Sequence, residues 1–191
     1  MTSIFATFPN LQTSHLILRR LRSEDADAVF DLFANDEVTR YYDLDRFTSI
    51  TQAQDLIARF QARFDRQIGI RWGLALSDSP NVLIGTCGYN IWVRPAHRGL
   101  LGYDLNRNHW GQGLMGEALR AILDFGFDAM QLNRVEALTF PQNTASKRLL
   151  TKLGFKKEGL LREYEYPKGS PQDMAIYALL ARERLRQINK T

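Results

Sequence analysis

The chain has 191 residues, of which 45% are hydrophobic and 24% charged, the ordinary balance of a globular protein with one sizeable core. Its single cysteine, Cys87, excludes an intramolecular disulfide and gives no support for a thiolate metal cluster, so we expect no metal. The net charge of +4 suits a ligand with several phosphate charges but is too diffuse to predict specific binding to nucleic acid.

Residues 1–5 lack the basic and apolar regions of a signal peptide, and no apolar stretch approaches the length needed to span a membrane. We therefore expect a cytoplasmic protein without a membrane partner. Its length predicts one domain over residues 1–191, with a core at about 16–180 and a charged C-terminal tail at 181–191.

Apolar periodicity predicts an alternating order of strands and helices. Strands are expected where apolar residues alternate or run together, at residues 16–21, 71–76, 82–93, 100–105, 134–139, 156–164 and 172–180. Helices are expected where the apolar period is 3.6, at residues 24–35, 51–66, 112–130 and 144–153. Ser23 is the expected cap of the first helix, and Gly154 the expected stop of the last one.

Three glycines lie between the strand at 100–105 and the body of the helix that follows: Gly111, Gly113 and Gly116. Glycine lets the backbone turn tightly and approach a ligand, and a helix N-terminus favours a phosphate group. The alternative is a glycine-rich helix start that binds no ligand. The segment lacks the Lys-Ser or Lys-Thr of a P-loop. It does match GxGxxG, so a nucleotide-dependent oxidoreductase is a rival, although Glu136 lies inside the next strand and not at its end.

Residues 110–118 resemble the pyrophosphate loop of the GNAT acetyltransferases, in the form used by a branch similar to the bacterial ribosomal-protein-alanine N-terminal acetyltransferases. Residues 16–26 and 143–155 are similar to the opening block and the second cofactor helix of that branch. Trp110 and Met115 depart from the wider family pattern. The resemblance covers about residues 16 to 180.

The resemblance implies an α/β fold, the GNAT fold, with a central mixed and mostly antiparallel sheet of about seven strands that splays between the fourth and the fifth. About four helices flank this sheet. The implied cosubstrate is acetyl-CoA, which donates its acetyl group to a primary amine that attacks it directly. The expected acetyl-CoA contacts are Leu105, Trp110, Gly111, Gln112, Gly113, Leu114, Met115, Gly116, Glu117, Asn143 and Ser146.

Three residues are the catalytic candidates: Leu105, Glu136 and Ser146. By resemblance, the Leu105 N–H donates to the oxyanion where the strands splay, and Ser146 protonates or hydrogen-bonds the leaving sulfur. Glu136 is the candidate base because burial in an apolar strand would raise its basicity, unless it pairs with an arginine or faces solvent. Asn143 either holds the pantetheine arm or only caps its helix, and Ser146 is otherwise a surface position. The family's usual tyrosine acid is replaced by Leu150, with Tyr103 as a fallback.

The sequence contains fewer signals for the identity of the acceptor amine. At pH 7.4 about 0.1% of a lysine amine is neutral, against roughly a quarter of an α-amine, so an N-terminal α-amine needs less help from a base. This argument and the resemblance favour a protein or peptide N-terminus. The alternatives are a small amine, such as a polyamine, amino sugar or antibiotic, and a CoA-binding module that does not catalyse. A homodimer is the default expectation for self-association. Candidate acceptor contacts are Tyr41, Tyr42, Trp72, Trp92, His97, Arg162, Tyr164 and Asp173.

Overall fold

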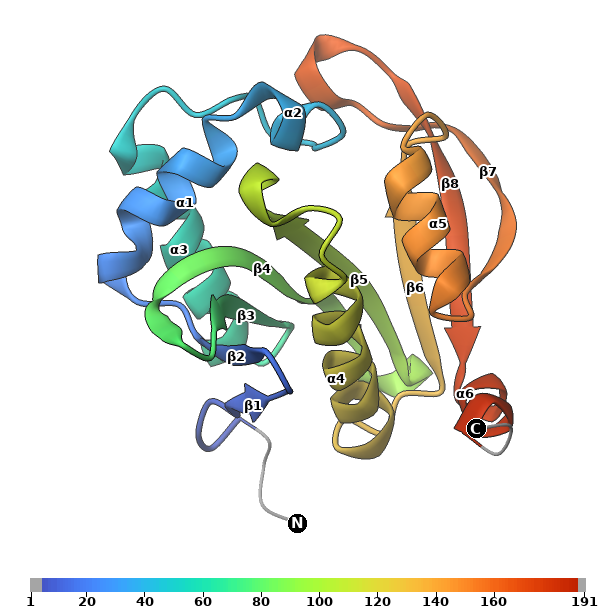
Figure 1. Ribbon diagram of the computed structural model, residues 1–191. Coiled ribbons are helices and arrows are strands. Elements are labelled where there is room, and N and C mark those ends of the chain that lie inside the picture. The colour runs from blue at the N-terminus through green and yellow to red at the C-terminus, as the bar shows by residue number, and fades with distance from the viewer. Residues whose placement is uncertain (1–4, 189–191) are drawn as a thin grey trace.

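The computed structural model describes residues 5–188, which form one eight-stranded sheet with helices on both faces (Figure 1). The strand order is β1-β2-β3-β4-β5-β6-β8-β7, and every neighbouring pair is antiparallel except β5 and β6. The strands are β1 Leu11–Gln12, β2 Leu16–Arg20, β3 Ile70–Leu76, β4 Ser79–Val93, β5 Arg98–Leu105, β6 Arg134–Thr139, β7 Lys156–Glu165 and β8 Gln172–Leu180. The expected α/β class and mostly antiparallel sheet are confirmed.

The structure has more elements than the sequence predicts. The α-helices are α1 Ala26–Phe33, α2 Asp36–Thr39, α3 Ile50–Asp65, α4 Leu114–Asp128, α5 Thr144–Lys152 and α6 Ala181–Ile188. The eighth strand is β1, whose two residues pair with β2. Because so short a strand has no measurable alternation, periodicity could not reveal it.

The expected helix at residues 24–35 is instead a short 3-10 turn, Ser23–Asp25, followed by α1 and then α2. Ser23 is not the cap. The buried carboxylate of Asp25 accepts the backbone N–H of Arg22 at 2.7 Å and two bonds from Arg19 at 2.7 and 2.8 Å. A partner from β2 therefore decides where this helical segment begins.

The charged segment at residues 181–191, expected as a tail, is a helix as far as residue 188, and residues 189–191 lie outside the described part of the chain. Arg184 of α6 donates to Asp124 at 2.7 Å and to Asp128 at 2.8 Å, both on α4. These ion pairs attach α6 to α4. Within the residues that the structure describes, no helix is long and apolar enough to cross a membrane.

Two hydrophobic clusters lie on opposite faces of the sheet. The larger one packs α4 on the central strands, where the buried Tyr89 hydroxyl donates to the Ile122 carbonyl at 2.8 Å. The smaller one packs α1 and α3 against the other face, around Phe33 and Phe60. Figure 1 shows α4 on the opposite side of β4 and β5 from α1 and α3.

The sheet opens between β5 and β6, which are the fourth and fifth of the predicted strands, as expected. These parallel strands pair from Arg98 with Arg134 as far as Leu101 with Ala137, and then separate. The last four residues of β5 therefore have no strand on that side. The gap lies at the carboxyl ends of two parallel strands, where ligands commonly bind in sheets of this kind.

Candidate active site

Two cavities meet at the opening between β5 and β6. The first, the glycine-turn cavity, has a volume of about 440 Å³ and is lined by Gly111, Gly113 and the first turn of α4. The second, the strand-gap cavity, has a volume of about 310 Å³ and lies between the ends of β5 and β6. Five residues line both cavities: Tyr41, Tyr42, Tyr103, Asn143 and Ser146. A ligand in one cavity can therefore reach a ligand in the other beside these five side chains.

The glycine turn has the geometry of a phosphate site. Gly111 and Gly113 have φ values of 76° and 81°, and no atom lies within 4 Å of where a Cβ would stand on either. Gly113 is the N-cap of α4, and the first bond back to it comes from the Glu117 N–H at 3.1 Å. The N–H groups of the intervening residues therefore lack partners within the helix and lie beside the cavity, as an anion requires. The turn thus fits the pyrophosphate of acetyl-CoA.

Leu105 presents its backbone N–H to the gap. The N–H of Asn106 donates to the Ile84 carbonyl of β4 at 2.8 Å. Alternate residues of an antiparallel strand point their N–H groups to opposite sides, so the Leu105 N–H points away from β4. The Leu105 carbonyl points the same way and accepts the Trp110 indole N–H at 2.7 Å. This orientation suits the predicted oxyanion donor.

Ser146 and Tyr103 meet where the two cavities join. Their hydroxyl oxygens are 2.7 Å apart, although they come from α5 and β5. Burial raises the pKa of Tyr103 to about 12, and the hydrogen bond with Ser146 opposes this only in part, so the phenol is protonated at neutral pH. Asn143 is the N-cap of α5, because its side-chain oxygen accepts the Ser146 N–H at 3.0 Å. The cap fixes the start of the helix that carries Ser146.

Glu136 is a correction. Its two oxygens accept bonds from Arg98 at 2.5 Å and from Arg134 at 2.7 Å. It lines neither cavity. A carboxylate that is engaged by two guanidinium groups and lines neither cavity is unsuited to act as the general base, and the alternative of an arginine pair is the one that the structure shows.

Two of the expected acetyl-CoA contacts, Gln112 and Glu117, also line neither cavity. Gln112 donates to the Asn108 carbonyl at 3.0 Å. Glu117 accepts the backbone N–H of His15 at 2.8 Å and lies 2.9 Å from its imidazole Nδ1. Burial would raise the pKa of Glu117, but hydrogen bonds with Thr13 and His15 outweigh it and leave this pKa below its usual value. This side chain joins α4 to the β1–β2 loop. The other predicted contacts line the glycine-turn cavity.

Of the candidate acceptor contacts, Tyr41 and Tyr42 line the cavities and the others do not. Trp72 is fully buried and donates to the Pro9 carbonyl at 2.6 Å. Asp173 accepts the Glu163 N–H at 2.9 Å and so holds an irregular turn of β7. The rest lie elsewhere, either at the far end of the sheet or on the exposed strand β7: Trp92, His97, Arg162 and Tyr164.

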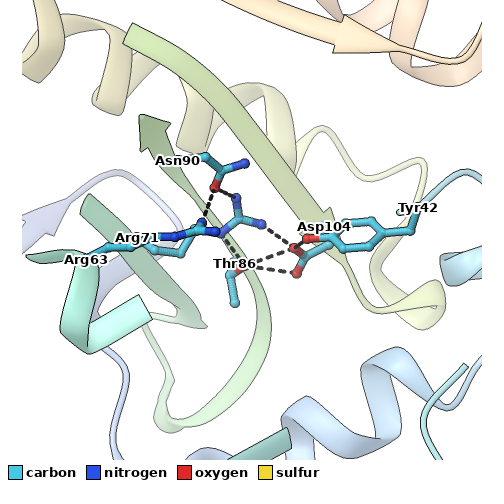
Figure 2. A network of polar contacts seen from close by, with 6 residues as sticks. All are labelled: Tyr42, Arg63, Arg71, Thr86, Asn90 and Asp104. Carbon is cyan, nitrogen blue, oxygen red and sulfur yellow. Dashed lines mark hydrogen bonds and ion pairs between the residues drawn. The ribbon is translucent and has the colours of Figure 1, made fainter. Parts of the chain in front are cut away.

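A buried polar network beside the cavities was missed by the sequence analysis (Figure 2). Arg71 and Asp104 form an ion pair in which each side chain is 2% exposed. Thr86 accepts from Arg71 at 2.7 Å and lies 3.0 Å from both oxygens of Asp104. The Tyr42 hydroxyl donates to Asp104 at 3.4 Å. The only signal in the sequence is a polar residue within a largely apolar stretch of each of three strands, and its meaning depends on the strand register.

Comparisons with known proteins agree with this geometry. Residues 15–156 match the model of the family described as the acetyltransferase (GNAT) domain. An uncharacterized N-acetyltransferase of Bacillus subtilis, YoaA, is 43% identical over 173 residues, which cover 91% of this chain and 97% of that protein. The chain belongs to the GNAT acetyltransferase family, and it is an acetyl-CoA-dependent N-acetyltransferase.

Two further proteins are similar to this chain. The [Ribosomal protein uS5]-alanine N-acetyltransferase of Escherichia coli is 30% identical, over 88% of this chain and 89% of that protein. The solved structure of RimL, a ribosomal L7/L12 alpha-N-protein acetyltransferase in complex with coenzyme A, superposes with a TM-score of 0.81 at 19% identity. That alignment covers 90% of this chain and 98% of the RimL chain, and it supports the fold.

Proposed function

We propose that this enzyme acetylates the N-terminal α-amine of a protein or peptide, and that the reaction takes place beside Tyr103 and Ser146. The observation that carries the proposal is the junction of the two cavities at this hydrogen-bonded pair. One cavity has a phosphate-binding turn, and the other is open to an acceptor. A group held in the first cavity and an amine held in the second meet next to Leu105.

The backbone has two roles in this proposal. The N–H groups at the start of α4 bind the pyrophosphate, which places the thioester toward the junction. The N–H of Leu105 donates to the carbonyl oxygen as it becomes an oxyanion. A preorganised donor of this kind typically lowers a barrier by about 3 kcal/mol.

The side chains handle the proton. As the nitrogen forms its bond to the carbonyl carbon, the carbon–sulfur bond breaks, and the reaction overall moves one proton from the nitrogen to the sulfur. The Ser146 hydroxyl donates to the departing sulfur, and the protonated Tyr103 hydroxyl donates in turn to Ser146. Asn143 supports this pair by capping α5 and by facing both cavities.

The ion pairs of Glu136 support an α-amine as the acceptor. With that carboxylate held by two arginines, the site lacks its predicted base, so an amine that is already partly neutral at pH 7 is favoured. An α-amine meets this condition far better than a lysine side chain. The names of the uS5 and L7/L12 acetyltransferases are consistent with such an acceptor.

Mass spectrometry of acceptors incubated with acetyl-CoA tests the proposal. We expect a 42 Da gain (about the mass of an acetyl group replacing hydrogen) at the N-terminus of peptides, with little on lysine side chains, because so few lysines are neutral. Acetylation confined to polyamines or amino sugars would refute the peptide acceptor. Binding of acetyl-CoA without transfer to any amine would indicate a module that does not catalyse.

A further inference from the structure

The strand-gap cavity carries its charges in an uneven way. Among its lining residues, Asp43 and Glu165 are acidic and Arg63 alone is cationic. Asp43 is exposed on the loop after α2, and Glu165 is half-buried at the end of β7. Arg63 is half-buried on α3, at the wall formed with β4. The cation and the two acids thus come from different elements around the same cavity.

The Asp43 carboxylate acts on Arg63 through its charge, but no acidic side chain among those described hydrogen-bonds to Arg63. Arg63 forms no ion pair, and its one hydrogen bond is a long one of 3.5 Å to the side-chain oxygen of Asn90. The Phe60 ring lies 5.8 Å from its guanidinium carbon. Arginines that are withdrawn from water are normally paired. A cation in a cavity with its donors largely unused is suited to binding an anion.

Arg71 lies behind this wall and shares a hydrogen-bond acceptor with Arg63. It donates at 3.0 Å to the same Asn90 oxygen that Arg63 approaches, as Figure 2 shows. The charge of Arg71 is matched by Asp104, whereas Arg63 has no ion pair with an acidic side chain among the residues described. Burial and the repulsion from Arg71 and Arg59 lower the pKa of Arg63, and Tyr42 and Asp43 oppose this only in part.

This wall is close to the reacting groups. Gly102 of β5 lines the cavity, and a Cβ there would lie 2.4 Å from the Asn90 amide nitrogen and 2.6 Å from Arg71 Nη1. Gly102 precedes Tyr103, whose side chain points to the other face of the strand, and both residues line this cavity at the opening of the sheet. The cavity therefore extends from the Tyr103–Ser146 hydroxyls over Gly102 to Asn90 and Arg63. Both ends therefore belong to one cavity.

We propose that Arg63, together with Asn90, forms an anion subsite, so that the preferred acceptor is an amine that carries a carboxylate near its reacting nitrogen. The inference rests on the proposed function, whose site it extends. The carboxylate has two sources: an acidic side chain close to a peptide N-terminus, or the α-carboxylate of a free amino acid. Asp43 and Glu165 attract the ammonium group, and Arg63 binds the anionic group.

Binding to the CoA-saturated protein tests the subsite without turnover. The probes are a tetrapeptide amide with glutamate at its second position and the same peptide with glutamine there, and alanine against alaninamide. In one of the two pairs, we expect calorimetry to show that the probe with the extra carboxylate binds about tenfold more tightly than the probe without it. This ratio equals about 1.4 kcal/mol. Preference within the first pair identifies a peptide side chain, and preference within the second a free amino acid.

Substitution of Arg63 supplies the second arm. In Arg63→Gln the preference should disappear, and in Arg63→Glu a peptide with lysine at the second position should become the preferred one. Arg66→Gln is the matched control, because Arg66 is exposed on the same helix end and lines neither cavity. For acetylated peptides the loss should be in KM, with kcat and the Kd for acetyl-CoA unchanged.

The outcomes separate the two proposals. Equal binding of acidic and neutral probes, or a preference that survives in Arg63→Gln, overturns the subsite, whatever the enzyme acetylates. A preference that depends on Arg63, in a protein that acetylates none of these amines, supports the subsite and overturns the proposed function.

Discussion

The two cavities that meet at Ser146 are built in different ways. The glycine-turn cavity takes more than half of its lining residues from one continuous segment, residues 103–116, and the chemistry of its turn is that of backbone N–H groups. The strand-gap cavity takes residues from the α2–α3 loop, α3, β4, β5, β6, α5, β7 and β8. A backbone site tolerates changes of side chain, whereas a side-chain site depends on each residue and on the register of the strands. The comparison predicts that substitutions near the first cavity act through conformation, and those near the second through charge.

The largest expected effect is on the buried Arg71–Asp104 pair, which lies beside the cavities and depends on charge. Asp104→Asn leaves the buried Arg71 charge without its partner, so the free energy of unfolding should fall by about 3–5 kcal/mol, measured by urea denaturation. The control is Glu136→Gln. The arginine partners of Glu136 are 24% and 41% exposed, so this substitution should lower the free energy of unfolding much less. The double variant Arg71→Met/Asp104→Leu should recover most of the loss. Equal losses in the two single variants would contradict this account.

The next largest effect is on catalysis at the junction. Ser146→Ala removes the hydroxyl that donates to the sulfur, so kcat should fall about 100-fold, a typical contribution of general acid catalysis. The Kd for acetyl-CoA should change little. Thr151→Ala, which removes a hydroxyl from the same helix outside both cavities, is the control and should keep full activity. An unchanged kcat in Ser146→Ala would remove this residue from the mechanism.

A smaller effect separates backbone strain from ligand binding. Gly113→Ala places a Cβ on a residue with φ of 81°, which should cost about 1–2 kcal/mol of stability. Gly169→Ala imposes the same strain at φ of 76°, away from both cavities. Both variants should lose stability in thermal unfolding, but only Gly113→Ala should also weaken acetyl-CoA binding, by about tenfold. Equal affinities would show that the turn does not hold the ligand.

The smallest effect concerns the contact that holds the start of α4. The pKa of Glu117 is lowered in the folded protein, so its contribution to stability is present above its unfolded pKa and is lost as the pH falls through the folded one. The free energy of unfolding of the wild type should exceed that of Glu117→Gln by less than about 1 kcal/mol at pH 5. This difference should vanish once the pH falls below the folded pKa of Glu117. A difference that grows as the pH falls would have the wrong sign.

The sequence by itself determined the order of the main elements, the class of fold and the position of the glycine turn before α4. These features are local, because a turn with glycines at φ values near 80° and the periods of strands and helices are written in consecutive residues. The same locality explains the errors. A two-residue strand is too short to show a period, and the end of a helix that depends on an Asp25–Arg19 pair requires a partner from another strand.

Only the tertiary structure decided which side chains form the site. Glu136 is a carboxylate within an apolar strand and was therefore predicted to be a buried base. In the structure its oxygens pair with two arginines, one of them from the neighbouring strand β5. Tyr103 and Ser146 are separated by 43 positions, yet their hydroxyl oxygens lie 2.7 Å apart where β5 and α5 both line the cavities. The Arg71–Asp104 pair depends on the register of β3, β4 and β5. Strand register and helix docking are set by packing across the whole sheet, so no local pattern can specify these contacts.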